Sequence, residues 1–321
     1  MPIPAAVAPV VFPRRPLVYP DDVFRVPVLV VSYFPAVDGV VRRSVTGDIE
    51  APIDVLRQHT IETTRRVVEA LELGSVYRGY RDVAAQPALR YDVVHSVEFI
   101  EPLPASAKAG HTVPMTNYRA IMERINIGRW VQEEGVKEVW IWGYHGGVID
   151  LWESNMAGPF GDISNSDRDA ADLPVFDRTY TVYHYNYARG ASEAVEDHMH
   201  QIEAVLRDRD EELFWRRFVG RPREARCGWA HFPPNGEHDY DWSNRKFVES
   251  DIEDWSPEGG TRRALNCERW GGDSLKWFIY WMESLPGRGN AITYRGRPLA
   301  NWWTFIGDWD GAMKRGLGLV E

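Results

Sequence analysis

One segment, Thr179–Leu206, constrains the fold most, because its pattern predicts a strand, a turn and a helix in direct succession. β-Branched and aromatic residues alternate over Thr179–Tyr187, which is the composition of a strand. Arg189-Gly190 interrupts that pattern, and Ser192 is a suitable N-cap for a helix over 192–207. A helix is therefore expected to start just beyond the carboxyl end of a strand.

Other apolar runs predict strands that alternate with segments of helical composition. The strands are expected at Val26–Phe34, Tyr91–Ile100 and Val136–Tyr144, and the helices at Pro52–Leu73 and Tyr118–Glu134. This alternation predicts an α/β fold with a largely parallel sheet and flanking helices. In such sheets ligands bind beyond the carboxyl ends of the strands, which here include His145-Gly146-Gly147 and Asn186–Arg189.

Three regions are expected along the chain. Residues 1–25 are rich in proline and predict an extended N-terminal arm, and residues 26–219 form the α/β catalytic core. From about Gly220 the sequence is loop-like and rich in Trp, with one helix at about Asp273–Leu285. We expect 220–321 to be a C-terminal cap packed on the same core, and an independent second domain is the alternative.

Composition excludes some partners. The net charge of −10 argues against nucleic acid or an anionic membrane surface, since either would require a basic patch. No apolar run approaches the roughly 20 residues of a membrane span. The first residues lack the basic and apolar regions of a signal peptide, although they are compatible with the start of a mature secreted protein. The oligomeric state is not set by the sequence.

The cysteine and tryptophan residues lead to two further expectations. Cys227 and Cys267 both lie in loop-rich segments, so a single disulfide closing a loop of about 40 residues is expected, and it would suggest export. Two unpaired thiols are the alternative. The 14 Trp residues are an excess that suits a heavy aromatic core, and as a group they also favour a carbohydrate-facing surface.

The helix after the fourth strand carries two stripes. Apolar residues recur on one of them, which is therefore the buried face: Val195, Met199, Ile202 and Leu206. Glu196, His200 and Glu203 follow the same spacing, rotated by about 100°, and lie at the edge of that face. Two carboxylates and an imidazole can hold a divalent metal or perform acid–base chemistry, and the alternative is a solvated flank. His198 points roughly 200° away from His200 and is expected to be a packing or surface residue.

The loop after the third strand adds further candidates. Its glycines allow a tight turn that leaves His145 and Glu153 near the functional edge of the sheet. Glu153 lies between Trp152 and Ser154-Asn155, where desolvation could raise its pKa toward the range of a general acid. The alternative is that Glu153 caps or salt-bridges the loop. Similarly, Arg189 either binds a substrate carboxylate or pairs with the acidic helix that follows it.

An acidic loop suggests calcium, although without a known motif. Oxygen ligands crowd this loop, namely Asp162, Asn165, Asp167, Asp169 and Asp172. The loop lacks the central Gly and terminal Glu of an EF-hand, so a solvated acidic loop is the alternative. No G-x-S-x-G, P-loop or H-E-x-x-H signature is present.

Several strings are specific enough to suggest a family: EVWIWGYHGG, WESNMAGPFGDISNSD, YNYARGASEAVEDHMHQIEAVL and HFPPNGEHDYDW. Over roughly residues 90–255 the chain resembles a family of secreted bacterial proteins of unassigned activity. The resemblance implies export and one shared site built from Glu153, Glu196, His200 and Glu203. In that family the helix is closer to His-x-x-x-His-x-x-Glu, with His at the position of Glu196, so the choice of metal is open.

These observations lead to one main hypothesis, a secreted hydrolase that acts on a glycan or glycoconjugate. Glu153, Glu203 and His200 are the expected catalytic residues, lying in one pocket, and Glu196, His200 and Glu203 the expected ligands of a zinc or calcium ion. The expected substrate-binding residues are Trp142, His145, Trp152, Asn155, Asn186, Tyr187 and Arg189. Without a metal, Glu153 and Glu203 become a glycosidase pair.

Two alternatives use the same residues differently. A metallopeptidase would take a third ligand such as His145 or His184. A non-catalytic carbohydrate-binding or adhesion protein would be stabilised by calcium at the acidic loop, and it would have an open, flat aromatic surface.

Overall fold

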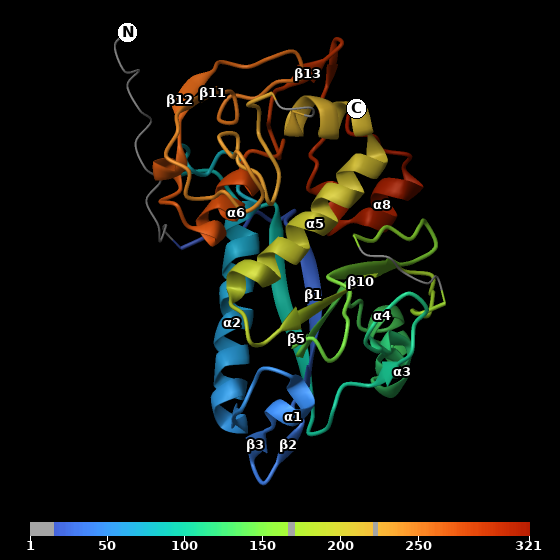
Figure 1. Cartoon of the computed structure of the whole chain (residues 1–321). Helices are drawn as coiled ribbons and strands as arrows, with labels where there is room; N and C mark the ends of the chain where they lie inside the picture. The colour runs from blue at the N-terminus through green and yellow to red at the C-terminus, as the bar shows by residue number, and fades with distance from the viewer. Residues whose placement is uncertain (1–15, 166–170, 221–223) are drawn as a thin grey trace. The chain divides into compact units, whose positions relative to one another are not determined.

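The computed structural model describes residues 16–165, 171–220 and 224–321 (Figure 1). The chain forms two compact units. Unit 1 comprises Met1–Phe24, Glu69–Arg90 and Ile202–Glu321, and unit 2 comprises Arg25–Val68 and Tyr91–Gln201. The unit boundaries therefore fall within helix α2 (Ile53–Gly74) and helix α5 (Ala191–Arg209), whereas a boundary near Gly220 was expected. Most of the predicted N-terminal arm, residues 1–15, lies outside the described residues.

A five-stranded sheet organises unit 2, with the order β5-β1-β8-β10-β9. Its strands are β1 (Phe24–Tyr33), β5 (Leu89–Phe99), β8 (Glu138–Gly143), β9 (Ser154–Ala157) and β10 (Tyr180–Asn186). β8 is parallel to both β1 and β10, while β9 is antiparallel to β10. Phe24 N–H donates to Ala88 O and Phe34 N–H to Phe99 O, so β5 also runs parallel to β1. The predicted α/β class with a largely parallel sheet is confirmed.

The direction in which successive strands are added to the sheet reverses at β1, which makes this strand a topological switch point. From β1 the chain passes through α2 to β5 on one side, and it then returns through α3 (Tyr118–Arg124) and α4 (Ile127–Gln132) to β8 on the other side. Open sheets of this kind bind ligands at the carboxyl ends of the strands. One continuous helix was predicted over Tyr118–Glu134. It is broken because Asn126 adopts a left-handed backbone with φ of 52°, which cannot continue a right-handed helix.

Helix α5 has the predicted apolar face. Val195, Met199, Ile202 and Leu206 are each at most 3% exposed. The helix begins at Ala191, one residue earlier than expected, so Ser192 lies in its first turn and is not the cap. At this end Gly190 N–H donates to Glu193 Oε2 at 3.1 Å, which satisfies a backbone donor that the helix leaves free.

Shorter elements complete unit 2. The small strands β2 (Ala36–Val37), β3 (Val40–Val41) and β4 (Ala51–Pro52) form an antiparallel sheet around α1 (Arg43–Thr46), and β6 (Ala105–Ser106) pairs with β7 (Met115–Thr116). Across the described ranges of the chain, no helix is long and apolar enough to cross a bilayer.

Unit 1 has a core dominated by tryptophan. Its elements are the π-helical segment η1 (Glu212–Val219), the short 3-10 helix η2 (Cys267–Arg269), the helices α6 (Ser274–Met282), α7 (Thr304–Gly307) and α8 (Trp309–Lys314), and the strand pairs β11 (Val248–Ser250) with β12 (Arg263–Leu265) and β13 (Thr293–Tyr294) with β14 (Arg297–Pro298). Six indole side chains are at most 2% exposed: Trp255, Trp270, Trp277, Trp281, Trp302 and Trp303. Five of these six indole N–H groups donate to backbone carbonyls, as in Trp281 to Gly228 O at 2.9 Å, and that of Trp303 has no partner among the described residues. The prediction that most Trp residues belong to a core is confirmed.

The expected disulfide is absent. Cys227 and Cys267 are both free and buried, so the prediction of a bridge is wrong. The Cys267 thiol donates to Ser243 O at 3.2 Å, and burial raises the pKa of both thiols. Each sulfur packs as a small apolar group in its own surroundings, and one argument for export is therefore lost.

Candidate active site

A polar cleft of about 440 Å³ lies in unit 2, beyond the carboxyl ends of β8 and β10. Four segments supply its walls: the loop between β8 and β9, the loop between β9 and β10, the end of β10 with the turn after it, and the first turns of α5. Its lining residues are His145, Asp150, Leu151, Glu153, Asn165, His184, Tyr185, Asn186, Arg189, Gly190, Glu193, Ala194 and Asp197. Of the residues that the strand-end rule selected, His145, Glu153, Asn186 and Arg189 line this cleft.

Glycine shapes the loop that carries His145. Gly146 and Gly147 have φ of 48° and 72°, and a Cβ on Gly146 would lie 1.9 Å from Thr46 O. Only glycine allows the two backbones to approach this closely. The turn is closed by a contact of 2.5 Å between His145 Nδ1 and Ile149 O. This fixes the position of the imidazole at the mouth of the cleft.

Glu153 has features of both interpretations made from the sequence, a residue of the cleft and a residue that holds the loop. Its carboxylate lines the cleft, and its Oε2 also accepts a hydrogen bond of 2.5 Å from Asn165 Nδ2. The contact ties the start of the acidic loop to the wall of the cleft. Asp167 and Asp169 of that loop lie outside the described residues.

Asp197, which the sequence analysis missed, is the second important carboxyl of the cleft. Burial raises the pKa of Asp197 well above its usual range, and the negative charge of Glu153 raises it further. Two carboxyl groups that share a site in this way cannot both ionise easily, so one tends to hold a proton. The cleft therefore combines a carboxyl able to donate a proton with one able to accept it.

His184 is held as a neutral side chain at the end of β10. It is 1% exposed, and burial together with nearby His145 lowers its pKa to about 3. Its Nδ1 lies 3.1 Å from the Tyr118 hydroxyl, which itself accepts the Trp152 N–H at 2.6 Å. The Tyr118 hydroxyl also lies 3.5 Å from Trp152 O, so it has two acceptors within reach, and donation to the nearer Nδ1 places the hydrogen of His184 on Nε2. Within the described part of the chain, Nε2 has no hydrogen-bond partner.

Arg189 presents a guanidinium at the rim of the cleft. Of the two alternatives left open for Arg189, an ion pair with the acidic helix is not formed among the described residues. Its charge lowers the pKa of Asp197, against the larger effect of burial. The backbone of Arg189 is fixed by a contact of 3.1 Å between its carbonyl oxygen and His59 Nε2. The side chain is therefore available to a polar group of a ligand.

Four predicted substrate-binding residues are not open to a ligand. Trp142, Trp152, Asn155 and Tyr187 are each at most 2% exposed, so their expected contact with substrate is not found in this structure. Trp152 instead stacks on Tyr118, with 4.8 Å between ring centroids and 3° between planes. Because Tyr118 holds His184, this stack supports the cleft from behind.

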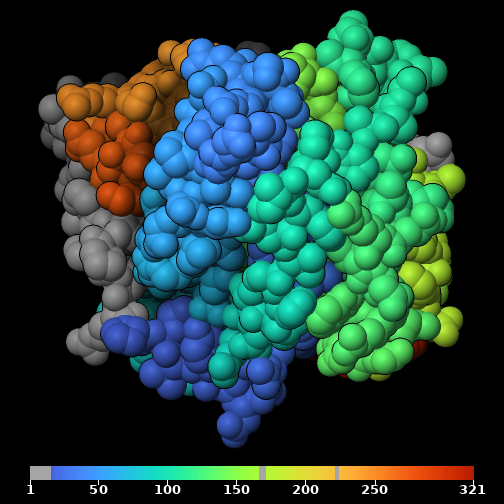
Figure 2. All heavy atoms as spheres, turned by 90° about the horizontal axis from the view of Figure 1, so that it is seen from below, coloured from blue at the N-terminus to red at the C-terminus, as the bar shows by residue number. Residues whose placement is uncertain are grey.

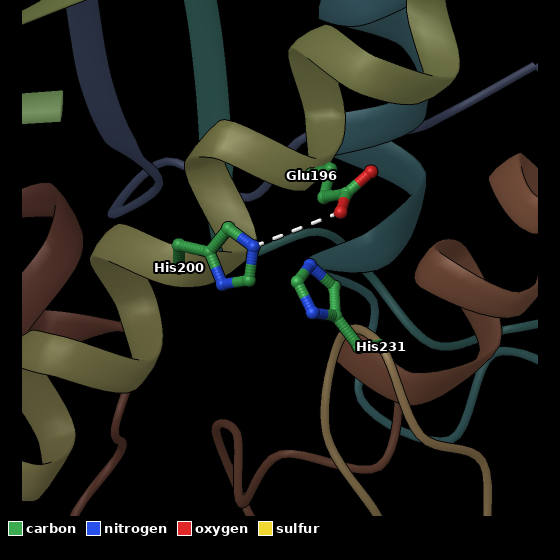
Figure 3. A group of neighbouring side chains, drawn as sticks. All are labelled: Glu196, His200 and His231. Carbon is green, nitrogen blue, oxygen red and sulfur yellow. Dashed lines mark ion pairs between the residues drawn. The ribbon is translucent and has the colours of Figure 1, made fainter. Parts of the chain in front are cut away.

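The expected ligand stripe on α5 is only partly brought together. Figure 3 shows Glu196 and His200 on successive turns, with Glu196 Oε1 and His200 Nε2 3.7 Å apart and both side chains largely buried. Figure 3 also draws His231, which belongs to unit 1. Glu196 and His200 could offer two donor atoms to one ion, and metal binding stays a prediction.

Glu203 has a different environment from the one expected. It belongs to unit 1, is 8% exposed, and its Oε1 accepts the Ala230 N–H at 2.7 Å. Glu153 thus lines the polar cleft without Glu196, His200 or Glu203. His198 packs as predicted, since it stacks on Tyr183 at 3.8 Å and contacts the Tyr185 hydroxyl at 2.6 Å.

A second concavity in unit 2 has a different character. Figure 2 shows α2 in light blue beside the blue-green segment that contains β5. A groove of about 540 Å³ lies where α2, β1 and β5 meet, and it is lined mostly by apolar side chains such as Val30, Phe34 and Val97. Its ionised groups are paired, Arg57 with Glu98 at 2.5 Å and Arg65 with Glu62 at 2.7 Å. It is therefore less suited to proton transfer than the polar cleft.

Comparisons with models of protein families, with curated protein sequences and with solved structures found no match. No relative therefore assigns a role to any residue of the cleft.

Proposed function

We propose that this chain is a hydrolase that acts on a glycan or glycoconjugate, with Glu153 and Asp197 as its acid–base pair. The observation that carries the proposal is the convergence of these two carboxyls with His184 and Arg189 in one cleft at the carboxyl edge of a parallel sheet. This pair replaces the pair of Glu153 and Glu203 expected from the sequence, because Glu203 is engaged with the Ala230 N–H.

The chemistry follows from two neighbouring carboxyls of which one holds a proton. The protonated group gives its hydrogen to the leaving oxygen as the glycosidic C–O bond breaks. In the inverting route water adds directly to the anomeric carbon and gives one hydrogen to the ionised carboxylate. In the retaining route this carboxylate first bonds to the anomeric carbon, and water then displaces it while giving one hydrogen to the deprotonated acid. In this scheme Asp197, the more desolvated group, is the acid and Glu153 is the base or nucleophile.

The lining of the cleft supports a hydroxyl-rich substrate. Asn186, Asn165 and Arg189 offer amide and guanidinium donors, which suit the hydroxyl groups of a sugar. The volume of about 440 Å³ lies within the range of small-molecule sites. A binding protein with an open Trp surface is less well supported, because the large Trp clusters are buried. Secretion stays a prediction.

Activity on sugars is the direct test. Release of reducing ends from a panel of polysaccharides and aryl glycosides would be measured for the wild type, Glu153→Gln and Asp197→Asn. Removing a general acid or base typically costs about 100-fold to 10,000-fold in rate, so we expect each variant to lose at least about 100-fold in kcat. Glu133→Gln, an exposed carboxyl at the end of α4, is the matched control and should keep full activity.

Three outcomes would contradict the proposal. Full activity of Glu153→Gln or Asp197→Asn would remove these residues from the chemistry. Saturable sugar binding without turnover by the wild type would support the binding-protein alternative. Peptide hydrolysis that stops on addition of a chelator would instead support the metallopeptidase.

A further inference from the structure

A cluster of arginines in unit 1 lines a cavity unrelated to the proposed active site. The cavity has a volume of about 480 Å³, and segments 75–88 and 288–291 form its walls. Three guanidinium groups line it, those of Arg78, Arg81 and Arg288, with Asp82 as its one lining carboxylate among the described residues. Asp82 is engaged locally, because its Oδ1 accepts the Ala84 N–H at 2.9 Å. The lining residues therefore carry three positive charges and one negative charge, in a chain whose net charge is −10.

The hydrogen-bonding capacity of two of these arginines is unused. Arg78 and Arg81 share the carboxylate of Asp254 at 3.7 and 3.9 Å, which is too long for hydrogen bonds. Neither guanidinium donates a hydrogen bond to another described residue. A guanidinium carries five N–H donors that match oxyanions in geometry, so two of them side by side suit a ligand with several oxygens.

The third arginine and a tyrosine complete the site. Arg288 is held by the Asp22 carboxylate and by Asp22 O at 3.1 Å, so its charge is fixed beside the cavity. The Tyr77 hydroxyl is buried and has no hydrogen-bond partner among the described residues. Burial raises the pKa of Tyr77 to about 12, so this hydroxyl keeps its hydrogen, and the Tyr77 side chain contributes to the lining of the cavity. Arg78 also lies over the Tyr77 ring, 4.9 Å from its centroid.

Backbone strain marks the same place. Arg78 has φ of 56°, in the left-handed region that favours glycine. A residue other than glycine in this conformation costs free energy, and such strain is commonly retained at binding sites. The strained backbone directs the Arg78 side chain toward the cavity wall that Arg81 and Arg288 share.

We propose that this cavity binds a phosphate or sulfate group carried by a small molecule. A tetrahedral oxyanion offers three or four oxygens to donors that approach from different directions, whereas a carboxylate offers two in one plane. The cavity also has room beyond the oxyanion for the group that bears it. The proposal is independent of the hydrolase activity proposed above.

Titration calorimetry on the full chain, in a phosphate-free buffer of low ionic strength, tests the site. The probes are inorganic phosphate, inorganic sulfate, glucose 6-phosphate and, as a planar control, acetate. We expect saturable binding of the first three that weakens with added salt, and no saturable binding of acetate. Tighter binding of glucose 6-phosphate than of phosphate identifies an ester as the ligand, and equal binding identifies the free ion.

Variants separate the site from general charge effects. Arg78→Gly and Arg81→Gln should each weaken phosphate binding at least ten-fold. Arg78→Gly should also keep or raise the melting temperature of the free protein, because glycine removes the left-handed strain. The matched control is Arg295→Gly, since Arg295 is exposed, has φ of 52° and lies outside the cavity lining. It should keep wild-type affinity.

Three results would overturn the proposal. They are the absence of saturable binding by any tetrahedral probe, equal binding of acetate, and an Arg295→Gly variant that loses as much affinity as Arg78→Gly. If Arg78→Gly fails to fold, Arg81→Gln decides alone, and unchanged affinity in that variant would rule the site out.

Discussion

Replacing Glu138 by Gln should make the protein more stable, and increasingly so as the pH rises. Glu138 is the first residue of β8 and is 4% exposed. Its Oε2 accepts the Trp140 indole N–H at 2.7 Å, and the Tyr91 hydroxyl lies 3.4 Å from its Oε1. Burial in the sheet raises the pKa of Glu138 from 4.5 to about 8. The folded protein therefore keeps a proton here that the unfolded chain releases.

The sign and size of the effect follow from proton linkage. Between about pH 4.5 and 8 the folded state binds more protons than the unfolded state, so this group makes the free energy of unfolding fall as the pH rises. At about 1.36 kcal/mol for each pKa unit, Glu138 lowers the free energy of unfolding by on the order of 5 kcal/mol above about pH 8, relative to its value below about pH 4.5. Gln is uncharged and keeps an oxygen for the Trp140 N–H, so the variant does not incur this loss.

Urea unfolding of both proteins at about pH 5, 7 and 9 would measure the difference. His184 acts in the opposite direction: because its pKa is lowered to about 3, it adds stability as the pH rises from about 3 to 6.5. Both proteins contain His184, so its contribution cancels when their unfolding free energies are subtracted. A stability difference that stays constant from about pH 5 to 9 would refute a strongly raised pKa at Glu138.

Two further predictions concern packing. In unit 1 the Arg226–Asp251 ion pair has a 2.7 Å contact and side chains that are 7% and 0% exposed. Asp251→Ala leaves the guanidinium of Arg226 buried without its carboxylate. We expect the free energy of unfolding, measured in urea, to fall by about 3–5 kcal/mol. A fall below about 1 kcal/mol would contradict a desolvated ion pair. In unit 2 a Cβ on Gly143 would lie 2.7 Å from His184 Nε2 and 2.8 Å from Leu103 Cδ1. Gly143→Ala should therefore lower stability by about 1–3 kcal/mol, and an unchanged melting temperature would show that both neighbours can move.

The main elements of the sheet were predictable because their signal is local. β1 and β8 are continuous apolar runs buried on both faces, and α5 shows its apolar stripe at helical spacing. β9 (Ser154–Ala157) was missed, since four residues without alternation carry no periodic signal. The break at Asn126 was also missed, because helix propensity does not indicate that one residue will adopt a left-handed backbone.

The sequence indicated the edge of the sheet where the cleft lies, but it did not indicate all the residues that line the cleft. The strand-end rule depends on topology alone, so it could bring His145, Glu153 and Arg189 to the cleft that they line in the structure. The importance of Asp197 and His184 depends on desolvation, and for His184 on Tyr118, 66 residues away in sequence. A helical stripe shows which residues share a face, but it cannot show that Glu203 meets a backbone N–H.

The arginines of this chain suggest a way to locate its binding sites. Acidic side chains outnumber basic ones by 47 to 37, so an exposed arginine is expected to meet a carboxylate. Many do, such as Arg57 with Glu98 and Arg65 with Glu62. Arg189 has no ion pair among the described residues, and Arg78 and Arg81 approach the Asp254 carboxylate only at 3.7 and 3.9 Å. None of the three makes a side-chain hydrogen bond to a described residue, and each lines a concave polar surface. In an acidic chain, guanidinium donors left open in a cavity are best explained by an anionic or hydroxyl-rich ligand that occupies it.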